Sequence, residues 1–403
     1  MKRILMLTGL HVWSLGSKKG ASSFYQTLKG YSDHGYEVDL ITCNRMDGLD
    51  IREVSDHHWN QKTLRKLGHI PKIGYIFRFL MWFAFQVYAV CVGLRLARRR
   101  RPTVLYAYEI AGVPVALLLG KLFGLPVVSR FQGTIMKPLM TSVGWRLRYW
   151  DHWLGLRARA NLVIMANDGT QGDLVLDALG VPRNTVRFWL NGVDVHPVQR
   201  SLQELAVLRQ RLGISSDTLV LLAVSRLVAW KRVERIIFAL PEVIRDVPEA
   251  RLVIVGDGEA RVGYERLVRK LNIGDHVLFT GAVPQSDVAE YMAIADIFVS
   301  LYDLSNVGNP LLESMALGKC IVTLNNGGTG SIVTHDANGV LIEPDALDRL
   351  PATVVALLLD SGRRLRLGRA AQEYARNSFW NWADRMNREI AEVERLSGGL
   401  DNG

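Results

Sequence analysis

The stretch Val299–Val333, VSLYDLSNVGNPLLESMALGKCIVTLNNGGTGSIV, predicts the parallel α/β crossover around which the chain is organised. The β-branched run Ile297–Val299 is typical of a buried strand. After a polar loop, Pro310 stands where the first turn of a helix tolerates a missing N–H, and Gly318 ends that helix. A second apolar strand, Cys320–Leu324, follows directly. Strand, loop, helix and strand together predict a right-handed parallel crossover.

The start of this predicted helix favours an anion-binding site. We expect unpaired N–H groups at 308–312 to point out of the carboxyl edge of the sheet, where anionic ligands bind. Glu313 lies about one turn inside the helix, placed for a sugar hydroxyl rather than for a phosphate. The alternative is an ordinary crossover in which Glu313 faces solvent.

The composition is that of a globular protein with a basic excess. A chain of 403 residues is long enough for two α/β domains, each with its own core. The formal net charge of +10 favours a polyanionic ligand, a nucleic acid or an anionic membrane surface. Cys43, Cys91 and Cys320 lie far apart without metal-ligand spacing, which is typical of reduced core cysteines in a cytoplasmic protein. The N-terminal MKRILMLTGL has too short an apolar run for a signal peptide and predicts the first strand.

The N-terminal residues predict a strand–helix–strand unit between Arg3 and Thr42 whose first turn, 9–23, is rich in glycine. Gly16 and Gly20 are not spaced as in the dinucleotide-binding fingerprint. Gly20, at the start of the helix, would let a ligand approach the backbone closely. The alternative is a flexible surface loop with two solvated lysines.

The segment 57–101 combines basic and apolar stretches. Residues 57–72 are basic, Phe79–Leu94 contains no charged residue, and arginines occupy 98–101. Two interpretations compete: a helix buried against the sheet, or an interfacial helix with aromatic residues in lipid and arginines on headgroups. A second aromatic and basic patch, Trp145–Trp150, adds weight to membrane contact.

Asn191 opens a turn, NGVD, that precedes Pro197, and there we place a domain boundary. We expect an N-terminal domain at 1–196 and a C-terminal domain at 197–378. The remainder, 379–403, predicts an amphipathic helix that crosses back to the first domain. Both large parts alternate strands and helices, which is typical of doubly wound parallel sheets.

Arg226 and Lys231 are the strongest charged candidates. Both follow the strand Leu219–Val224 at the mouth of the next helix, where a diphosphate would need two cations. Arginine grips a phosphate in a bidentate manner, and lysine supplies a mobile point charge. The alternative, solvated surface charge, weakens because Gly256 and Glu313 are predicted at the same edge.

These residues resemble the motifs of family 4 retaining glycosyltransferases of the GT-B fold. The resemblance covers nearly the whole chain and rests on a combination of short motifs, each weak alone. These are SRLV (225–228) with Lys231, GDG (256–258), FTG (279–281), PLLESMALGK (310–319), the glycine loop near Gly20 and NGVD (191–194).

The resemblance implies two facing doubly wound domains with a nucleotide sugar, of the UDP or GDP type, bound mainly to the second. Arg226 and Lys231 would hold the diphosphate, and Glu313 would hydrogen-bond the ribose. No metal or other cofactor is needed in such sites, because cations and helix N-termini stabilise the leaving diphosphate. The further residues expected to contact the donor are Gly20, Gln132, Asn191, Gly256, Gly258, Val283, Ser305, Asn306, Gly308, Asn309 and Leu311.

Three positions depart from the family pattern at the sugar end of the donor. Ser305 replaces the first glutamate of the E-x7-E motif, Gln132 replaces a histidine of the first domain, and 328–332 read GTGSI instead of Gly-x-Pro-Glu-Ile. We therefore expect an atypical sugar, or atypical recognition of it. Unchanged sugar selectivity in both Ser305→Glu and Gln132→His variants would count against this expectation.

The sequence thus predicts a retaining glycosyltransferase. The acceptor would be a hydroxyl of a surface glycan or a lipid-linked glycan, and the enzyme would be cytoplasmic and peripheral on the inner membrane face. The alternatives are a GT-B nucleotide-sugar epimerase or hydrolase, which would need paired acids, and a nucleic-acid-binding protein. The basic residues flank an apolar, aromatic helix rather than a nucleic-acid motif, which argues against the last. His11, His57, His58 and His152 have no predicted role.

Overall fold

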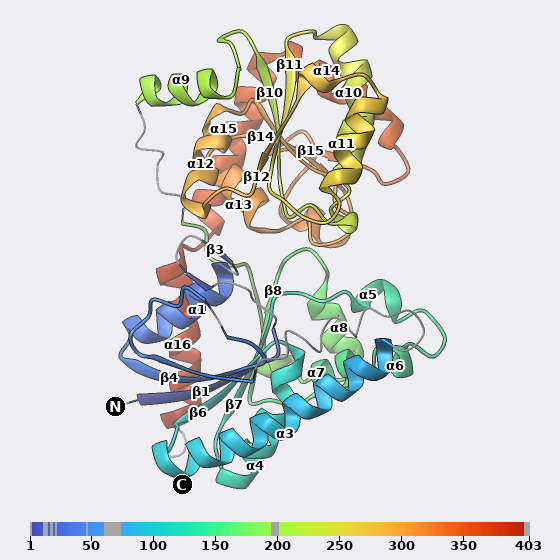
Figure 1. Cartoon of the computed structure of the whole chain (residues 1–403). Helices are drawn as coiled ribbons and strands as arrows, with labels where there is room; N and C mark the ends of the chain where they lie inside the picture. Colours follow the sequence, from blue (N-terminus) through green and yellow to red (C-terminus); the bar gives the residue numbers. More distant parts are fainter. Residues whose placement is uncertain are drawn as a thin grey trace. The chain divides into compact units, whose positions relative to one another are not determined.

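The computed structural model describes residues 2–10, 15–16, 19–20, 22–45, 47–59, 74–194 and 201–398 (Figure 1). The chain divides into two compact units. The N-terminal unit comprises Met1–Asn167, Gln171–Gly192 and Trp382–Gly403, and the C-terminal unit comprises Asp168–Thr170 and Val193–Asn381. The expected boundary at Pro197 and most of the basic stretch 57–72 lie outside the described residues.

The N-terminal unit is built on a seven-stranded parallel sheet of order β5-β4-β1-β6-β7-β8-β9. Buried β-branched and aliphatic runs form its central strands, as a sheet covered on both faces requires. The strands are β1 (Lys2–Thr8), β4 (Tyr36–Thr42), β5 (Val54–His58), β6 (Val104–Tyr108), β7 (Val127–Phe131), β8 (Leu162–Ala166) and β9 (Val186–Trp189), with a separate antiparallel pair, β2 (Leu15–Gly16) and β3 (Lys19–Gly20).

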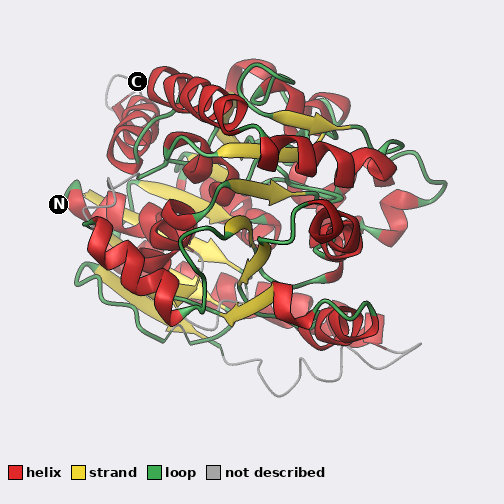
Figure 2. Cartoon of the chain, turned by 90° about the horizontal axis from the view of Figure 1, so that it is seen from above, coloured by secondary structure: helices red, strands yellow, loops and turns green. Residues whose placement is uncertain are grey.

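Helical residues pack on this sheet in two separate core clusters, one on each face; Figure 2 shows helices and strands of the chain in different colours. Leu5 and Leu7 of β1 belong to one core cluster, whereas Ile4 and Met6 belong to another, because successive strand side chains point to opposite faces. The helices are α1 (Ser22–Asp33), α3 (Gly74–Arg100), η2 (Ile110–Gly112), α4 (Val113–Phe123), α5 (Met136–Leu139), α6 (Trp145–Arg148), α7 (Trp150–Arg157), α8 (Gly172–Ala178), η3 (Arg183–Thr185) and α16 (Trp382–Gly398).

A buried ionic network fixes α16 to the sheet of the N-terminal unit. The Glu389 carboxylate is fully buried and accepts hydrogen bonds from Arg130 Nη1 at 3.0 Å and Arg385 Nη1 at 2.9 Å. The hydroxyl groups of Tyr106 and Tyr31 donate to its other oxygen at 2.6 and 3.2 Å. The last helix therefore completes the core of the first unit, although almost the whole C-terminal unit precedes it in the sequence.

The C-terminal unit contains a six-stranded parallel sheet of order β12-β11-β10-β13-β14-β15. The strands are β10 (Leu219–Val224), β11 (Ala250–Val255), β12 (Val277–Gly281), β13 (Ile297–Ser300), β14 (Cys320–Leu324) and β15 (Val340–Ile342). The helices are α9 (Leu202–Arg211), η4 (Ala229–Lys231), α10 (Glu234–Asp246), α11 (Arg261–Lys270), η5 (Gly274–His276), α12 (Gln285–Ile294), α13 (Asn309–Ala316), η6 (Thr329–Ser331), η7 (Leu347–Arg349), α14 (Leu350–Leu359) and α15 (Ser361–Ser378). The crossover predicted from Val299–Val333 is present as β13, α13 and β14.

Helix α3 has one buried face and one exposed apolar face. Phe85, Ala89 and Leu96 belong to the core under α4. The opposite face exposes large apolar side chains, each between 44% and 53% accessible, which are Ile76, Phe79, Leu80, Phe83 and Val87. The helix is long and apolar enough, over Ile76–Arg100, to cross a membrane, but core helices of soluble proteins meet the same criterion. The expected burial against the sheet is confirmed for one face of the helix, and membrane contact by the other face stays a prediction.

Candidate functional site

The loop after β10 places Lys231 against two aromatic rings at the carboxyl edge of the C-terminal sheet. Lys231 ends η4, and its Nζ lies 3.8 Å from the ring centroid of Tyr302 and 4.3 Å from that of Trp230. Tyr302 is buried, and its hydroxyl group donates to the carbonyl of Val224 at 2.9 Å, which anchors the ring to the end of β10. The ammonium group therefore sits over two π faces.

Burial makes the charge of Lys231 conditional. Burial is the largest of the effects that bring the pKa of Lys231 down to about 7; the carboxylate of Asp168 opposes the shift, and the positive charge of Arg226 adds to it. Within the described residues, no hydrogen bond or ion pair engages the Nζ of Lys231 or the exposed guanidinium of Arg226. The two cations stand together at the mouth of α10, an arrangement that an anionic ligand would stabilise.

Asp168 is the acidic neighbour of these cations, and the sequence patterns did not single it out. It accepts hydrogen bonds from the amide and the hydroxyl of Thr170 at 3.1 and 2.5 Å, and from the hydroxyl of Ser305. Burial raises the pKa of Asp168 in spite of these bonds. Its position just past the carboxyl end of β8 could have flagged it, but only the folded chain places Asp168–Thr170 with the C-terminal unit.

The first turn of α13 differs from the expectation. The amides of Leu311 and Leu312 both donate to the carbonyl of Gly308, at 3.0 and 3.2 Å, so they are not unpaired as predicted. The reason is that Gly308 is the N-cap residue with an extended backbone, which turns its carbonyl into the helix. The amide of Gly308 itself has no hydrogen-bond partner among the described residues. Fewer N–H groups of this turn are therefore free to bind an anion than predicted.

Glu313 is half-buried on α13 rather than solvated. Burial, with a smaller contribution from the charge of Asp194, raises the pKa of Glu313 to about 7. Its Oε1 accepts a hydrogen bond from Gln285 Nε2 at 3.2 Å. A carboxyl group in this state gains from hydroxyl donors that stabilise its charged form.

Gly256 and Gly258 have a structural explanation in the fold itself. Gly256 has φ of 132°, and a Cβ there would lie 1.9 Å from the carbonyl oxygen of Ser225. A Cβ at Gly258 would lie 2.3 Å from the carbonyl oxygen of Leu227. The loop after β11 thus packs directly on the backbone that carries Arg226, and only glycine permits that approach.

The loop between β13 and α13 is held together from inside. Asn306 is buried and bonds the backbone of Tyr302 in both directions, donating from Nδ2 at 2.8 Å and accepting at Oδ1 at 3.0 Å. Ser305 adopts φ of 60° and bonds Asp168. Asn306 therefore shapes the loop, and its expected contact with a donor stays a prediction. Val283, half-buried between β12 and α12, and Asn309, the first residue of α13, lie at the same edge of the sheet.

Gln132 and Asn191 meet at the carboxyl edge of the N-terminal sheet. Asn191 Nδ2 donates to Gln132 Oε1 at 3.1 Å, and Gln132 Nε2 donates to the hydroxyl of Tyr108 at 2.7 Å. The amide of Gln132 donates to Glu109 Oε1 at 2.8 Å. Glu109 has φ of 66° and ψ of 166°, a region that is essentially restricted to glycine. The strained backbone of Glu109 was not predicted, and only the position of this residue after β6 could have suggested a role at the site.

Gly20 and the two histidines at the end of β5 make local contacts within the N-terminal unit. Gly20 ends β3, paired with Leu15 of β2. His57 Nε2 lies 3.2 Å from Asp39 Oδ1, and His58 Nδ1 lies 3.0 Å from Asp56 Oδ2. Within the part of the chain that the structure describes, no group of three or more His, Cys, Asp or Glu side chains is arranged to hold a metal ion.

Two glycosyltransferase family profiles match the chain. Residues 20–196 match "Glycosyltransferase Family 4" and residues 206–374 match "Glycosyl transferases group 1". A GDP-mannose-dependent alpha-(1-6)-phosphatidylinositol monomannoside mannosyltransferase of Mycobacterium tuberculosis is 29% identical over 221 residues, 53% of this chain and 57% of that protein. The chain thus spans little more than half the length of this relative. An uncharacterized glycosyltransferase of Methanocaldococcus jannaschii is 27% identical over 92% of both chains.

The fold also matches solved structures. HepE of Anabaena, crystallised with UDP-glucose, superposes with a TM-score of 0.73 at 22% identity, covering 98% of this chain and 100% of that one. Two doubly wound parallel sheets of this kind, with ligand-edge loops on both, define a GT-B fold. The chain belongs to the family 4 glycosyltransferases.

Proposed function

We propose that this protein transfers a sugar from a nucleoside diphosphate sugar to a hydroxyl group of an acceptor, with retention of configuration at the anomeric carbon. The observation that carries the proposal is the pair Arg226 and Lys231, which share the carboxyl edge of the C-terminal sheet without an anionic partner that neutralises both. Such an edge is where α/β sheets bind phosphate ligands. The family membership supports the same proposal, since family 4 is a family of retaining glycosyltransferases.

The proposed chemistry uses the cations to stabilise the leaving group. The bond between the anomeric carbon and the diphosphate oxygen breaks while the acceptor oxygen forms its bond on the same face of the sugar. The acceptor proton passes to an oxygen of the departing diphosphate. Arg226 and Lys231 offset the charge that develops there, a preorganised electrostatic contribution that needs no protein nucleophile.

Glu313 is proposed to hold the ribose. Burial and the charge of Asp194 raise the pKa of Glu313 to about 7, and Gln285 donates one hydrogen bond to its carboxyl group. Two ribose hydroxyl groups would supply donors to the carboxylate and favour its ionised form. Uridine and guanosine share ribose and diphosphate, so these residues do not select the base.

We propose a lipid-linked or glycan acceptor and a peripheral position on the inner face of a membrane. The mycobacterial relative is named for transfer to a phosphatidylinositol monomannoside, which supports a lipid acceptor. The exposed apolar face of α3 and the arginines at its end, Arg98–Arg100, form the amphipathic pattern of an interfacial helix. The vesicle measurement described below tests this position.

A thermal-shift screen of UDP, GDP, ADP, TDP and their common sugar conjugates tests the donor. A ligand at about 100 times its dissociation constant adds about 2.7 kcal/mol of stability. We expect one nucleoside diphosphate to stabilise the protein and Lys231→Ala to abolish that shift. Lys270→Ala, an exposed lysine on α11 of the same unit, is the matched control and should retain it. If no nucleotide stabilises the protein, the proposed function is wrong.

A further inference from the structure

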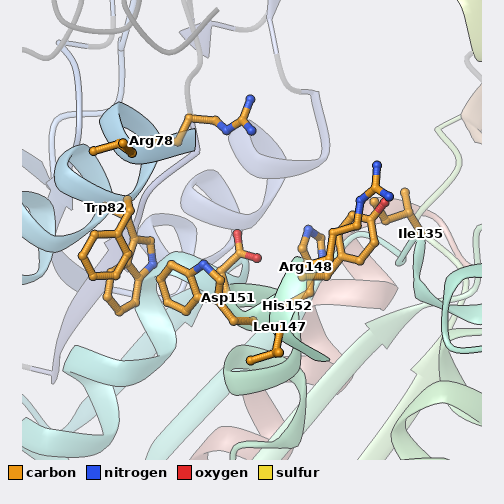
Figure 3. Close-up of a pocket in the computed structure, with 11 residues that line it drawn as sticks. Arg78, Trp82, Ile135, Leu147, Arg148, Asp151 and His152 are labelled. Atoms are coloured by element: carbon orange, nitrogen blue, oxygen red, sulfur yellow. The ribbon is translucent and has the colours of Figure 1, made fainter. Parts of the chain in front are cut away.

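The N-terminal unit contains a pocket that the donor chemistry does not use. It has a volume of about 850 Å³, within the range of small-molecule sites (Figure 3). Three elements line it: α3, the residue Ile135 before α5, and the run from α6 into α7. The lining residues are Ile76, Arg78, Phe79, Trp82, Ile135, Leu147, Arg148, Tyr149, Trp150, Asp151 and His152.

Aromatic side chains form a rigid wall of this pocket. Trp82 and Trp150 meet edge to face with ring centroids 4.6 Å apart, and Phe79 meets Trp150 in the same way at 5.5 Å. Each ring is fixed by its neighbour and by its helix, so the apolar lining is formed without a ligand. Burial lowers the pKa of His152 and so disfavours a positive charge in the lining, although the charge of Asp151 opposes the shift. The wall suits a hydrocarbon rather than a sugar.

Two guanidinium groups belong to the lining, those of Arg78 and Arg148. Leu147 is 84% accessible, and its neighbour Arg148 is exposed as well, which places a guanidinium where the apolar lining meets solvent. The acidic side chain in the lining is Asp151. An apolar interior with an arginine at the mouth complements an amphiphile whose headgroup carries a phosphate.

The pocket lies next to the polar edge of the N-terminal sheet. Ile135, in its lining, follows Gln132 by three positions after the end of β7. Helix α7 packs on η2, which begins directly after Glu109, and a Cβ on Gly155 would lie 2.8 Å from Ile110 Cβ. A chain held in the pocket would thus have its headgroup near the strand ends, where Gln132 and Glu109 lie.

We propose that this pocket binds the hydrocarbon chain of the acceptor, a lipid with a phosphate in its headgroup, and that Arg148 contacts the phosphate. The inference rests on the proposed function and names its acceptor class. The pocket encloses about 850 Å³, which is room for the hydrocarbon of a lipid, whereas Leu80, Phe83 and Val87 of α3 are exposed outside it and suit contact with a bilayer. The pocket would hold the acceptor, and the exposed face would bring the protein to the membrane.

The test uses alkyl phosphates of increasing length, from octyl to hexadecyl, below their micelle concentrations and without nucleotide. Tryptophan emission reports binding, because Trp82 and Trp150 line the site. Affinity is expected to rise about fourfold for each added methylene. The affinity should stop rising once the chain is longer than the pocket. The stoichiometry should be one alkyl phosphate per protein. A rise that never levels off, or no binding by any chain, overturns the proposal.

Matched substitutions separate the pocket from the surface around it. Ile76 and Val87 lie on the same exposed face of α3, 44% and 50% accessible, but only Ile76 lines the pocket. Ile76→Trp should weaken dodecyl phosphate binding about tenfold or more by filling the pocket, and Val87→Trp should not. Ile135→Trp, from a different element, should act like Ile76→Trp. Equal effects of the Ile76 and Val87 substitutions would contradict the proposal.

The arginines offer a second matched pair. Arg146 and Arg148 are both exposed on α6, but only Arg148 lines the pocket. Loss of a charge-assisted bond in Arg148→Gln should weaken dodecyl phosphate binding about tenfold. Arg146→Gln should change it less than about twofold. If both variants bind like the wild type, the phosphate is not held at Arg148 and the headgroup assignment is wrong.

Vesicles distinguish the acceptor from bulk lipid. Cosedimentation with phosphatidylcholine vesicles, with and without phosphatidylglycerol, reports on the apolar face of α3 and should respond to Phe83→Ser but not to Ile135→Trp. Sedimentation with anionic vesicles combined with no binding of monomeric alkyl phosphate would leave only a membrane face and overturn the pocket. A failure of the proposed nucleotide-sugar binding would be detected separately by the nucleotide thermal-shift screen, because that shift does not depend on this pocket.

Discussion

Replacing Glu389 by alanine is expected to lower the free energy of unfolding of the N-terminal unit by about 3–5 kcal/mol. The substitution leaves the guanidinium groups of Arg130 and Arg385, 1–2% accessible, without their carboxylate. The hydroxyl groups of Tyr31 and Tyr106 lose their acceptor at the same time. Removing one member of a buried ionic network costs more than the network contributes relative to an apolar core, because buried charges remain unpaired.

Urea unfolding followed by tryptophan emission measures the effect. Trp189 is a local reporter, since the guanidinium of Arg385 lies 4.6 Å from its ring centroid. The melting temperature should fall on the order of 10 °C. The matched control is Glu394→Ala on the same helix, whose exposed pair with Lys2 is worth at most about 1 kcal/mol. A Glu389→Ala variant as stable as the Glu394→Ala variant would show that the network does not secure α16.

The same network predicts acid sensitivity. Burial disfavours the charge of Glu389, but the guanidinium groups of Arg130 and Arg385 together hold its pKa below the ordinary value. A carboxyl group whose pKa is lowered in the folded state contributes stability above its unfolded pKa, and that stability is lost as the pH falls. The wild type should therefore lose stability below about pH 4.5 more steeply than Glu389→Gln.

The second large effect concerns the pH dependence of donor binding. The pKa of Lys231 is lowered to about 7, so the free protein loses this charge as the pH rises above neutrality. A bound diphosphate favours the ammonium form, and binding above pH 7 must therefore take up a proton. Affinity for a nucleotide sugar should fall with a slope approaching about tenfold per pH unit. A sugar conjugate is preferable, because its esterified diphosphate does not titrate in this range.

Glu313 titrates in the same range with the opposite effect, since its pKa is raised to about 7 and its carboxylate form would accept ribose hydroxyl groups. The measurement is therefore made by calorimetry between pH 6 and pH 9, in a Glu313→Gln background. Lys231→Arg in that background is the control, because arginine stays charged throughout and should give a flat profile. Parallel profiles for lysine and arginine would rule out Lys231 as the titrating cation.

Much of the fold could be predicted from the sequence because buried parallel strands are written as continuous apolar runs. Residues Ile297–Val299 and Cys320–Leu324 are such runs, and both are strands at the expected places. The spacing of Arg226, Gly256 and Glu313 along successive strand–helix units also placed them at one sheet edge, since all strands of that sheet are parallel. The roles proposed for them remain predictions until the nucleotide measurements are made.

Other features could not be read from local patterns. The amides of Leu311 and Leu312 seemed available because a helix start has unpaired donors in general, but the carbonyl of Gly308 accepts both. Gly256 suggested ligand contact, whereas the backbone at Ser225 already requires a residue without a Cβ. In each case the deciding atom belongs to a neighbour whose position depends on three-dimensional packing.

The sequence by itself determined the class of fold, the family and the sheet edge that carries the cations, because periodicity and short motifs are local properties of a chain. Only the tertiary structure decided the surroundings that shift the pKa values of Lys231 and Glu313. The aromatic rings around Lys231, the carboxylate of Asp168 and the burial of Glu313 come from segments far apart in the sequence. Tertiary structure also joined α3 to α6 and α7 around one pocket, because side chains distant in sequence meet only when the chain is folded.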